Sequence, residues 1–426
     1  MASTVNQHYL EKVIDLSEQL PVTATEDIYD SRGNKLLAKG AKVSRLLQEK
    51  LILHKLTRPL EASLSVVGGV DAGIVVRTAE RLLADNPALA AIVAVSAGNG
   101  PSPLALLSQL QFGNAITMML TIAERGGNEA LDHAVTVAIT AACLARQMAL
   151  SPEQQQSCVL AGLLHDIGEL YVDPAYLAPG RQLLPHEWAH LVVHPRTGQI
   201  LIAEHEAYPP EVARAVAEHH ERLDGSGYPR RLQAGAISPC GQVLAAAEAI
   251  SGMLRGEQAL ERAEVALKLI TSEHDRRIAS TVSRARKHLA SISAPKPFAA
   301  GLRGDPNTGL YAKLVDAIDS VHALAGSTGL SPSTRELLDR VATRLTLLRR
   351  AAVSSGLDLA LLPDGDGFDG LIVFEHAVAT REIGWRMREL SRELALASCT
   401  IGERALLAPL DALLDPLPPP ALARVA

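Results

Sequence analysis

Aromatic side chains are scarce in this sequence: Phe, Tyr and Trp make up 3% of its 426 residues, whereas hydrophobic residues as a whole reach 47%. Strands are enriched in aromatic and β-branched residues, so a core built from alanine and leucine favours helices. Few rings are available to stack on the bases of a single strand, and a formal net charge of −6 offers a polyanion no attraction. We therefore expect a mainly α fold and no nucleic-acid partner.

Paired cysteines, a leader and a long apolar run are also lacking. The cysteines lie far apart without any CxxC motif, which excludes a disulfide framework: Cys143, Cys158, Cys240 and Cys399. The first residues, MASTVNQHYLEKVIDL, lack the basic and apolar regions of a signal peptide. The longest apolar stretch, residues 87–98, is far shorter than the ~20 residues that a membrane span needs. We therefore expect a cytoplasmic protein that makes no contact with a membrane.

Changes in composition along the chain predict several segments. Asp30 to Gly33 form a turn signal between two short apolar runs, which predicts a hairpin. Helical periodicity recurs late in the chain, over 311–324, 333–352 and 372–397. The expected order is a small N-terminal α/β unit (1–60), a helical or mixed connector (61–114), a helical domain with most of the histidines (115–292), a linker (293–309), a C-terminal helical domain (310–416) and a Pro-rich tail (417–426).

Histidines and acidic residues recur in the central domain at spacings that suit metal binding. His165-Asp166 lies inside the apolar run GLLHDIGEL, so we expect this polar pair to point inward, where it needs a partner such as a metal. Adjacent helical residues do not share a face, so His219-His220 suits two metal ions better than one. The full candidate set offers oxygen and nitrogen ligands for divalent metals: Glu129, His133, His165, Asp166, His194, His219, His220 and Glu248.

Two of these sites lie in longer motifs, LLHDIG around His165 and HHERLDGSGYP from His219 to Pro229. In this order, with a histidine upstream and another between them, the motifs closely resemble the HD-GYP family of bacterial cyclic di-GMP phosphodiesterases, within the HD superfamily. The resemblance covers roughly residues 115–290. It implies a core that is an HD-type helical bundle, flanked here by the N-terminal α/β unit and a C-terminal helical accessory domain.

The resemblance also implies the chemistry of the site. It implies two or three divalent metal ions, iron or manganese, and hydrolysis of cyclic di-GMP to pGpG and GMP by an activated water. His165 and Asp166 would be catalytic as well as ligating, and Glu129 would serve a third ion. Signalling proteins would bind at the GYP loop (residues 224–229), and the C-terminal helices suit a core or the seam of a homodimer. The loop and substrate residues are Asp224, Gly225, Gly227, Tyr228 and Arg255.

Three acidic residues depart from the family pattern. Glu248 stands where the family has Asp, and Glu169 replaces a lysine expected to meet a phosphate. Glu257 lies roughly where an arginine would face phosphate, with Arg255 two residues away. An anion near a phosphate is unfavourable, so substrate binding is weakened while metal binding is kept. The alternative hypothesis is therefore a regulatory module that holds metal and binds partners with little or no turnover.

A second alternative rests on His186, Glu187 and His190, which form a literal HExxH, the helix motif of zinc proteases. The motif lacks the extension that would supply a third ligand, because Leu191-Val192-Val193-His194 follows it. The HD-GYP pattern accounts for Glu187 and His194 without a protease. We therefore rank a zinc protease well below the phosphodiesterase.

Overall fold

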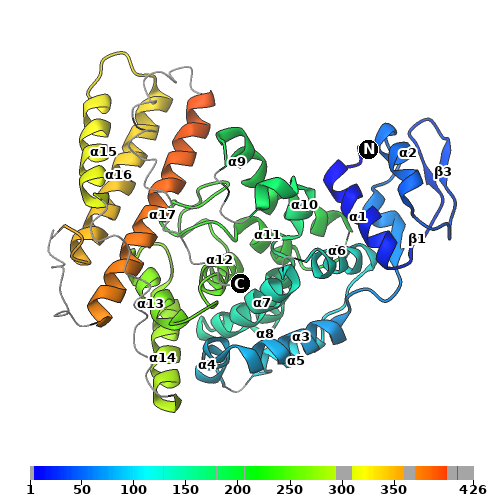
Figure 1. The fold of residues 1–426 in the computed structure, drawn as a ribbon, viewed down its shortest axis with the longest axis horizontal. Helices are drawn as coiled ribbons and strands as arrows, with labels where there is room; N and C mark the ends of the chain where they lie inside the picture. Colours follow the sequence, from blue (N-terminus) through cyan, green and yellow to red (C-terminus); the bar gives the residue numbers. More distant parts are fainter. Residues whose placement is uncertain are drawn as a thin grey trace. The chain divides into compact units, whose positions relative to one another are not determined.

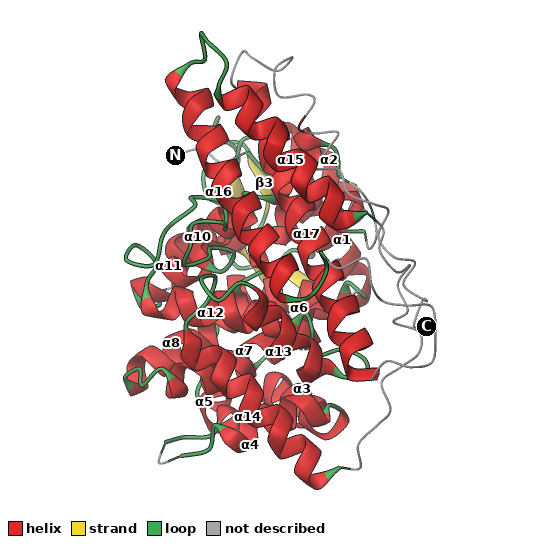
Figure 2. Cartoon of the chain, turned by 90° about the vertical axis from the view of Figure 1, so that its left-hand side faces the viewer, coloured by secondary structure: helices red, strands yellow, loops and turns green. Residues whose placement is uncertain are grey.

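The computed structural model describes residues 4–98, 100–127, 129–178, 181, 183–205, 207–293, 309–358, 370–400 and 410. Helices dominate this part of the chain and the few strands are short (Figure 2), so the expected mainly α fold is confirmed. None of the helices in these ranges is apolar over a length that could cross a bilayer. The chain divides into two compact units. Unit 1 comprises Met1–Pro179, His190–Arg255 and His274–Leu289, and unit 2 comprises Gly180–Ala189, Gly256–Glu273 and Ala290–Ala426.

Unit 1 begins with one helix and two small antiparallel sheets. Strand β1 pairs with β4, and β2 pairs with β3 across the turn at Asp30 to Gly33, so the predicted hairpin is confirmed. Helix α1 begins after the cap Asn6, whose side chain accepts a hydrogen bond from the backbone of Tyr9. The elements are α1 (Gln7–Gln19), β1 (Val22–Ala24), β2 (Ile28–Tyr29), β3 (Lys35–Leu37), η1 (Arg45–Leu47), α2 (Gln48–Leu53), η2 (Leu60–Ser63) and β4 (Leu64–Val66).

The rest of unit 1 is helical (Figure 1). Helix α8 packs against α7, α11 and α12, and these helices carry or precede most of the candidate ligands. The elements are α3 (Ala72–Asp85), α4 (Pro87–Val95), α5 (Pro103–Ser108), α6 (Asn114–Arg125), α7 (Ala130–Gln147), α8 (Pro152–Leu164), η3 (Ile167–Tyr171), η4 (Pro174–Leu177), α10 (His194–His205), α11 (Pro210–Glu218), α12 (Pro239–Ser251) and α14 (Arg276–Ile292), the last of which ends beyond the unit.

Helices α7 and α8 approach closely because small residues meet between them. A side chain at Gly162 would place its Cβ 2.8 Å from Cα of Ala138, closer than any real contact of this kind. Helix α8 starts with a capping box, in which Ser151 and Gln154 satisfy each other's backbone N–H groups, and Pro152 occupies the first turn. Sequence thus fixes both where α8 begins and how near it lies to α7.

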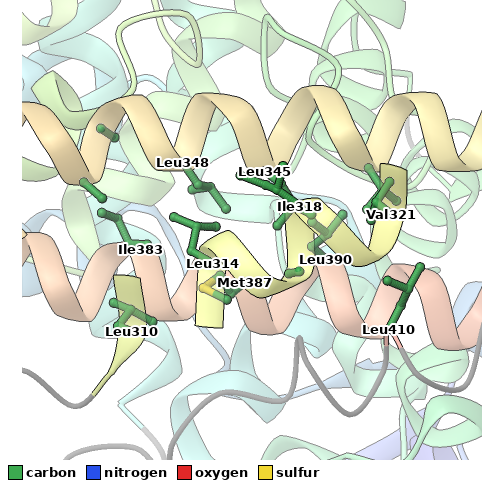
Figure 3. Close-up of a cluster of buried hydrophobic side chains, with 14 of the residues drawn as sticks. Leu310, Leu314, Ile318, Val321, Leu345, Leu348, Ile383, Met387, Leu390 and Leu410 are labelled. Carbon is green, nitrogen blue, oxygen red and sulfur yellow. The ribbon is translucent and has the colours of Figure 1, made fainter. Parts of the chain in front are cut away.

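Unit 2 has its own apolar core between three long helices, α15 (Leu310–Ala325), α16 (Pro332–Ser354) and α17 (Gly370–Thr400). Figure 3 shows Leu314, Leu345 and Met387 among the side chains that fill this core. These helices confirm the three that were predicted for the C-terminal part. Unit 2 also contains α13 (Ala259–Leu269) and the first part of α9 (Pro185–Leu191).

Two predicted segments fall mostly on residues that the structure does not describe. Of the linker at 293–309, only residues 293 and 309 are described, and the Pro-rich tail at 417–426 lies wholly outside the described residues. The other domain boundaries stay predictions. Cys143, Cys158 and Cys240 are buried free thiols, as expected for small core residues.

Candidate metal centre

Three helices of unit 1 bring a first ligand group together, which consists of His133, His165 and Glu248. His133 lies in the first turns of α7, His165 ends α8, and Glu248 lies in α12. Oε2 of Glu248 is 3.0 Å from Nε2 of His133 and 3.2 Å from Nε2 of His165. One ligand atom from each residue thus faces a common point, at a spacing that can hold a metal ion.

A second ligand group consists of Asp166, His194, His219 and His220. His194 begins α10, and His219-His220 directly follow α11. Oδ1 of Asp166 lies 3.5 Å from Nε2 of His194 and 3.6 Å from Nε2 of His219. His220 belongs to the same group, and its ring centroid is 4.1 Å from that of His219. His219 and His220 therefore both belong to the second ligand group, whereas the sequence analysis expected the pair to serve two metal ions.

Asp166 joins the two ligand groups. Its Oδ1 faces the second group, while its Oδ2 is 2.9 Å from Nε2 of His165 and 3.8 Å from Nε2 of His133. A carboxylate can accept on both oxygens at once. The arrangement therefore offers one carboxylate that could bridge two neighbouring metal ions.

Backbone carbonyls fix the orientation of three ligand rings. Nδ1 of His165 lies 2.8 Å from the oxygen of Gly162, and His194 and His219 make the same contact with the residue three positions earlier, at 2.8 and 2.6 Å. A carbonyl can only accept, so Nδ1 carries the proton and donates. The neutral ring then presents a lone pair at Nε2, the atom that faces the ligand groups, as in metal-binding histidines with an outer hydrogen-bond partner.

Electron-rich atoms converge in both groups in a way that suits a cation. Nε2 of His194 and Nε2 of His219 are 3.1 Å apart. Nε2 of His165 and Oε2 of Glu248 are buried and make no hydrogen bond, although they are 3.2 Å apart. Burying polar atoms without a partner is unfavourable, and a bound cation would satisfy these lone pairs. The residues present therefore fit divalent metal ions.

The electrostatics of the groups keep the carboxylates ionised and favour neutral His219 and His220, whereas they favour the charged form of His133, His165 and His194, from which a metal ion would have to displace a proton. Burial disfavours the charged form of Asp166 and of Glu248, but the neighbouring histidines outweigh it and hold both pKa values well below their ordinary range. Burial also opposes the charged form of His165, yet the Asp166 and Glu248 carboxylates raise its pKa. Burial lowers the pKa of His219 and, more strongly, that of His220. Ionised carboxylates and neutral imidazoles are the forms that ligate metals.

The GYP loop closes onto the second ligand group through His220. The ring of Tyr228 stacks on the His220 ring with centroids 4.5 Å apart, and its backbone N–H donates to the oxygen of His220 at 3.0 Å. Gly227 is needed here, because any side chain would collide with the backbone of His220 and Glu221. Gly225 adopts φ +79°, and Asp224 accepts from the backbone of Ser226 at 3.0 Å. These predicted loop residues thus form a tight turn beside the ligands.

Glu221, to which the sequence analysis gave no role, fixes the end of this turn. Its carboxylate is fully buried and accepts the backbone N–H groups of Arg230 at 2.7 Å and Leu232 at 2.8 Å. The signal was present in the sequence, as the acid directly after the histidine pair. Its spacing alone does not reveal that the side chain binds backbone rather than metal.

The structure does not bring Glu129 into either ligand group. Its side chain is 68% exposed and pairs with Arg255, with 3.2 Å between Oε2 and Nη1. Glu129 also caps α7 in a left-handed conformation with φ 53°. Its role as a ligand for a third ion, and the role of Arg255 toward substrate, stay predictions.

Of the two acids that stand where the family pattern has a cation, Glu169 lies near the ligands. It belongs to η3, directly after the His165-Asp166 pair. Burial and repulsion from Asp166 raise its pKa to about 7. Glu257, by contrast, is exposed in a segment of unit 2.

The HExxH residues do not form a metal site in the part of the chain that is described. Glu187 accepts a hydrogen bond from the backbone of Leu184 at 2.9 Å and pairs with Arg181. Its carboxylate therefore caps the start of α9. His190 packs beside Tyr176, with ring centroids 6.1 Å apart, and neither it nor His186 belongs to a group that could hold a metal.

Comparison with known proteins agrees with this geometry. Residues 117–282 match the family model described as HD domain. A 3'3'-cGAMP-specific phosphodiesterase of Vibrio cholerae is 30% identical over 140 residues, which cover 32% of this chain and 31% of the relative. A cyclic di-GMP phosphodiesterase of Pseudomonas aeruginosa is 37% identical over 107 residues, covering 25% and 26%, respectively. The response regulator RpfG of Xanthomonas campestris, also named a cyclic di-GMP phosphodiesterase, is 34% identical over 116 residues, covering 27% and 30%.

The chain thus contains an HD domain, a helical domain whose His and Asp side chains can hold divalent metal. The HHERLDGSGYP motif and these relatives make this domain similar to those of the HD-GYP family. The matched segments span about a third or less of each of these relatives, so likeness to them is limited to this domain.

Proposed function

We propose that the chain is a metal-dependent phosphodiesterase that hydrolyses cyclic di-GMP. The observation that carries the proposal is Asp166, whose two oxygens face different ligand groups. Two adjacent metal ions suit the in-line displacement at a phosphodiester. The names of the relatives support a cyclic dinucleotide as substrate. Water adds to one phosphorus and one ester P–O bond breaks, which opens the ring to pGpG; further hydrolysis yields GMP.

The metals in this proposal are iron or manganese, one for each ligand group, with a third ion only if Glu129 turns inward. Mixed imidazole and carboxylate ligands accept either metal. When bound, such ions activate water as Lewis acids and neutralise charge on a phosphoryl group. A cytoplasmic location, a homodimer and protein partners at the GYP loop remain predictions.

The chain's own residues prepare the site before substrate arrives. The carbonyls of Gly162, Leu191 and Val216 hold three imidazoles with their lone pairs facing inward, so little reorganisation is needed on binding. Tyr228 keeps the GYP loop against His220, which leaves this loop beside the reacting phosphodiester. Arg255 supplies a cation for a substrate phosphate when it exchanges Glu129 for that anion.

The test is hydrolysis of cyclic di-GMP and 3'3'-cGAMP by purified protein loaded with Mn²⁺ or Fe²⁺, with products separated by ion-exchange chromatography. Asp166→Asn removes one anionic ligand from both groups and should lower kcat at least about 100-fold. Asp132→Asn, in the first turn of α7 and paired with Arg81 outside both ligand groups, is the matched control and should retain activity. Circular dichroism verifies that both variants fold. A metal-loaded wild type that leaves both nucleotides intact contradicts the proposal.

A second candidate is a metal-holding module without turnover, and Glu169 is the observation that favours it. This carboxyl group lies close enough to Asp166 to be affected by its charge, where the family pattern has a lysine for phosphate. Removing this repulsion in Glu169→Lys should tighten cyclic di-GMP binding about tenfold or more, measured by calorimetry. Unchanged affinity would show that Glu169 does not limit substrate binding.

A further inference from the structure

The N-terminal helix α1 lies against η3, the short helix that follows the His165-Asp166 pair. Nζ of Lys12 donates to the backbone oxygens of Leu170 at 2.9 Å and Val172 at 3.4 Å. Nδ2 of Asn6 donates to the oxygen of Tyr171 at 3.2 Å. Side chains of α1 therefore satisfy the last carbonyls of η3, which a helix end leaves without partners. This contact joins residues that are more than 150 positions apart in the sequence.

Aromatic packing strengthens the same contact. The rings of Tyr9 and Tyr171 stack with centroids 4.9 Å apart and planes 8° from parallel, and Tyr9 is fully buried. The hydroxyl of Tyr171 donates to Glu61, in η2 of the N-terminal segment. Residues 4–66 thus contact η3 through both α1 and η2, although they lie outside the segment that matches the HD domain.

The opposite end and face of η3 contact the second ligand group. Asp166 caps η3, and its backbone oxygen accepts from the N–H of Glu169 at 2.8 Å. Gly168 lies so close to the start of α10 that any side chain would collide with the carbonyl oxygen of His194. A shift of η3 would therefore move Asp166 directly and displace the backbone of His194. Both residues belong to the second ligand group.

Lys12 also brings a positive charge toward Glu169. Burial lowers the Lys12 pKa, and attraction to the Glu169 carboxylate partly restores it. The family pattern has its cation at position 169 itself, whereas in this chain a lysine from α1 approaches the acid at that position. Lys12 on α1 would therefore compensate for the lysine that the family pattern has at position 169 and that this chain replaces with Glu169.

We propose that Lys12 is a positioning residue of the metal centre, and that α1 sets the metal affinity of the second ligand group by holding η3. The N-terminal α/β unit thereby becomes part of the centre: any partner or ligand that displaced α1 would loosen Asp166 and His194. The inference deepens the proposed function and rests on it for metal binding, but not for turnover.

The experiment compares Mn²⁺ dissociation constants of three full-length variants by equilibrium dialysis, well below their unfolding temperatures. Lys12→Met keeps length and removes the donor to Leu170 and Val172, so it should weaken Mn²⁺ binding about tenfold, the lower end of the loss seen when a ligand's own hydrogen-bond partner is removed. Lys12→Arg retains donors for both carbonyls and should restore binding to within about threefold. Gln7→Ala removes an exposed hydrogen bond to Glu11 on the same helix and should change nothing.

If Lys12 only stabilises the fold, Lys12→Met will lower the unfolding temperature but leave the Mn²⁺ affinity of the folded protein unchanged. That result would overturn the inference. If Lys12→Met does not fold, Asn6→Ala decides the question with the same measurement, since it removes one donor to η3. A wild type that binds Mn²⁺ without hydrolysing cyclic dinucleotides contradicts the proposed function alone, because the dissociation constants still test α1. A wild type that binds no metal overturns both.

Discussion

Acidic residues in and beside the ligand groups serve two different purposes, and only their contacts distinguish them. Asp166 and Glu248 face imidazole nitrogens, whereas Glu221 faces two backbone N–H groups. Burial raises the pKa of Glu221, and the two backbone N–H groups partly offset this without any metal. Glu221 therefore fixes the shape of the chain beside the ligands, and its contribution to activity should be indirect.

Glu221→Gln should loosen the GYP loop. The amide has one acceptor, so its NH₂ group would face the N–H of Arg230 or Leu232, a loss of roughly 1.5–3 kcal/mol for a charged hydrogen bond. We expect a higher KM for cyclic di-GMP with a smaller change in kcat, because His219 and His220 stay in place while the loop moves. Steady-state kinetics check this. The exposed Glu204→Gln on α10 should match the wild type, and an equal loss in that variant would contradict the argument.

At the residue level, the sequence predicted which residues make up the metal centre better than it predicted the ion pairs they form. Every predicted ligand except Glu129 lies in one of the two groups, because the motifs fix residue types at the ends of consecutive helices. Their role as ligands stays a prediction. The pairing of Glu129 with Arg255 could not be predicted, since it depends on a left-handed turn before α7 and on a residue more than 120 positions away.

At the level of elements, amphipathic helices were predictable and close helix crossings were not. The C-terminal helices follow from apolar periodicity, which needs no knowledge of the partner. Nothing in the sequence indicates that Gly162 permits a close helix crossing, because a glycine inside a helix usually destabilises it. Glycine is required at this position because the backbone of Ala138, in the neighbouring helix α7, leaves no room for a side chain.

Gly162→Ala should therefore destabilise the protein despite the better helix propensity of alanine. The new Cβ would press on the Ala138 backbone, and overpacking of this kind costs about 1–3 kcal/mol. His165 would move as well, because its Nδ1 donates to the oxygen of Gly162. Gly384→Ala, inside α17 with no atom closer than 3.7 Å, is the control and should stabilise by roughly 0.5–1 kcal/mol. Urea unfolding measures both, and equal signs for the two variants would refute the explanation.

At the scale of the whole molecule, sequence order and structural units do not coincide. Two segments from within the HD-domain match, Gly180–Ala189 and Gly256–Glu273, belong to unit 2 with the C-terminal helices. Within that unit, Arg392 lies over the ring of Trp188 at 4.9 Å, and Arg386 binds Glu273. Local sequence patterns do not predict such contacts, because they join residues more than 100 positions apart. Removing the C-terminal helices would therefore also remove partners from the HD-domain segments.

The buried ion pair between Arg386 and Glu273 allows this dependence to be measured. Nε and Nη2 of Arg386 donate to the two carboxylate oxygens at 2.7 and 2.6 Å, and Glu382 accepts a further bond at 2.9 Å. Arg386→Met should leave the buried Glu273 and the partly exposed Glu382 without their cation and destabilise unit 2 by about 3–5 kcal/mol. The double variant Arg386→Met/Glu273→Leu should recover most of that loss, since a buried pair contributes little against apolar residues of similar size.

The control for this cycle is Arg340→Met, which removes an exposed pair with Glu336 in α16 and should change stability by less than about 1 kcal/mol. Chemical unfolding of the wild type, Arg386→Met, Glu273→Leu and the double variant gives the coupling energy between residues 386 and 273. A coupling near zero would mean that α17 does not hold the turn after α13 through this pair. A strong coupling, with the Mn²⁺ affinity of the unit 1 ligands unchanged, would show that the C-terminal helices stabilise HD-domain segments without tuning the metal centre, the task that we propose for α1.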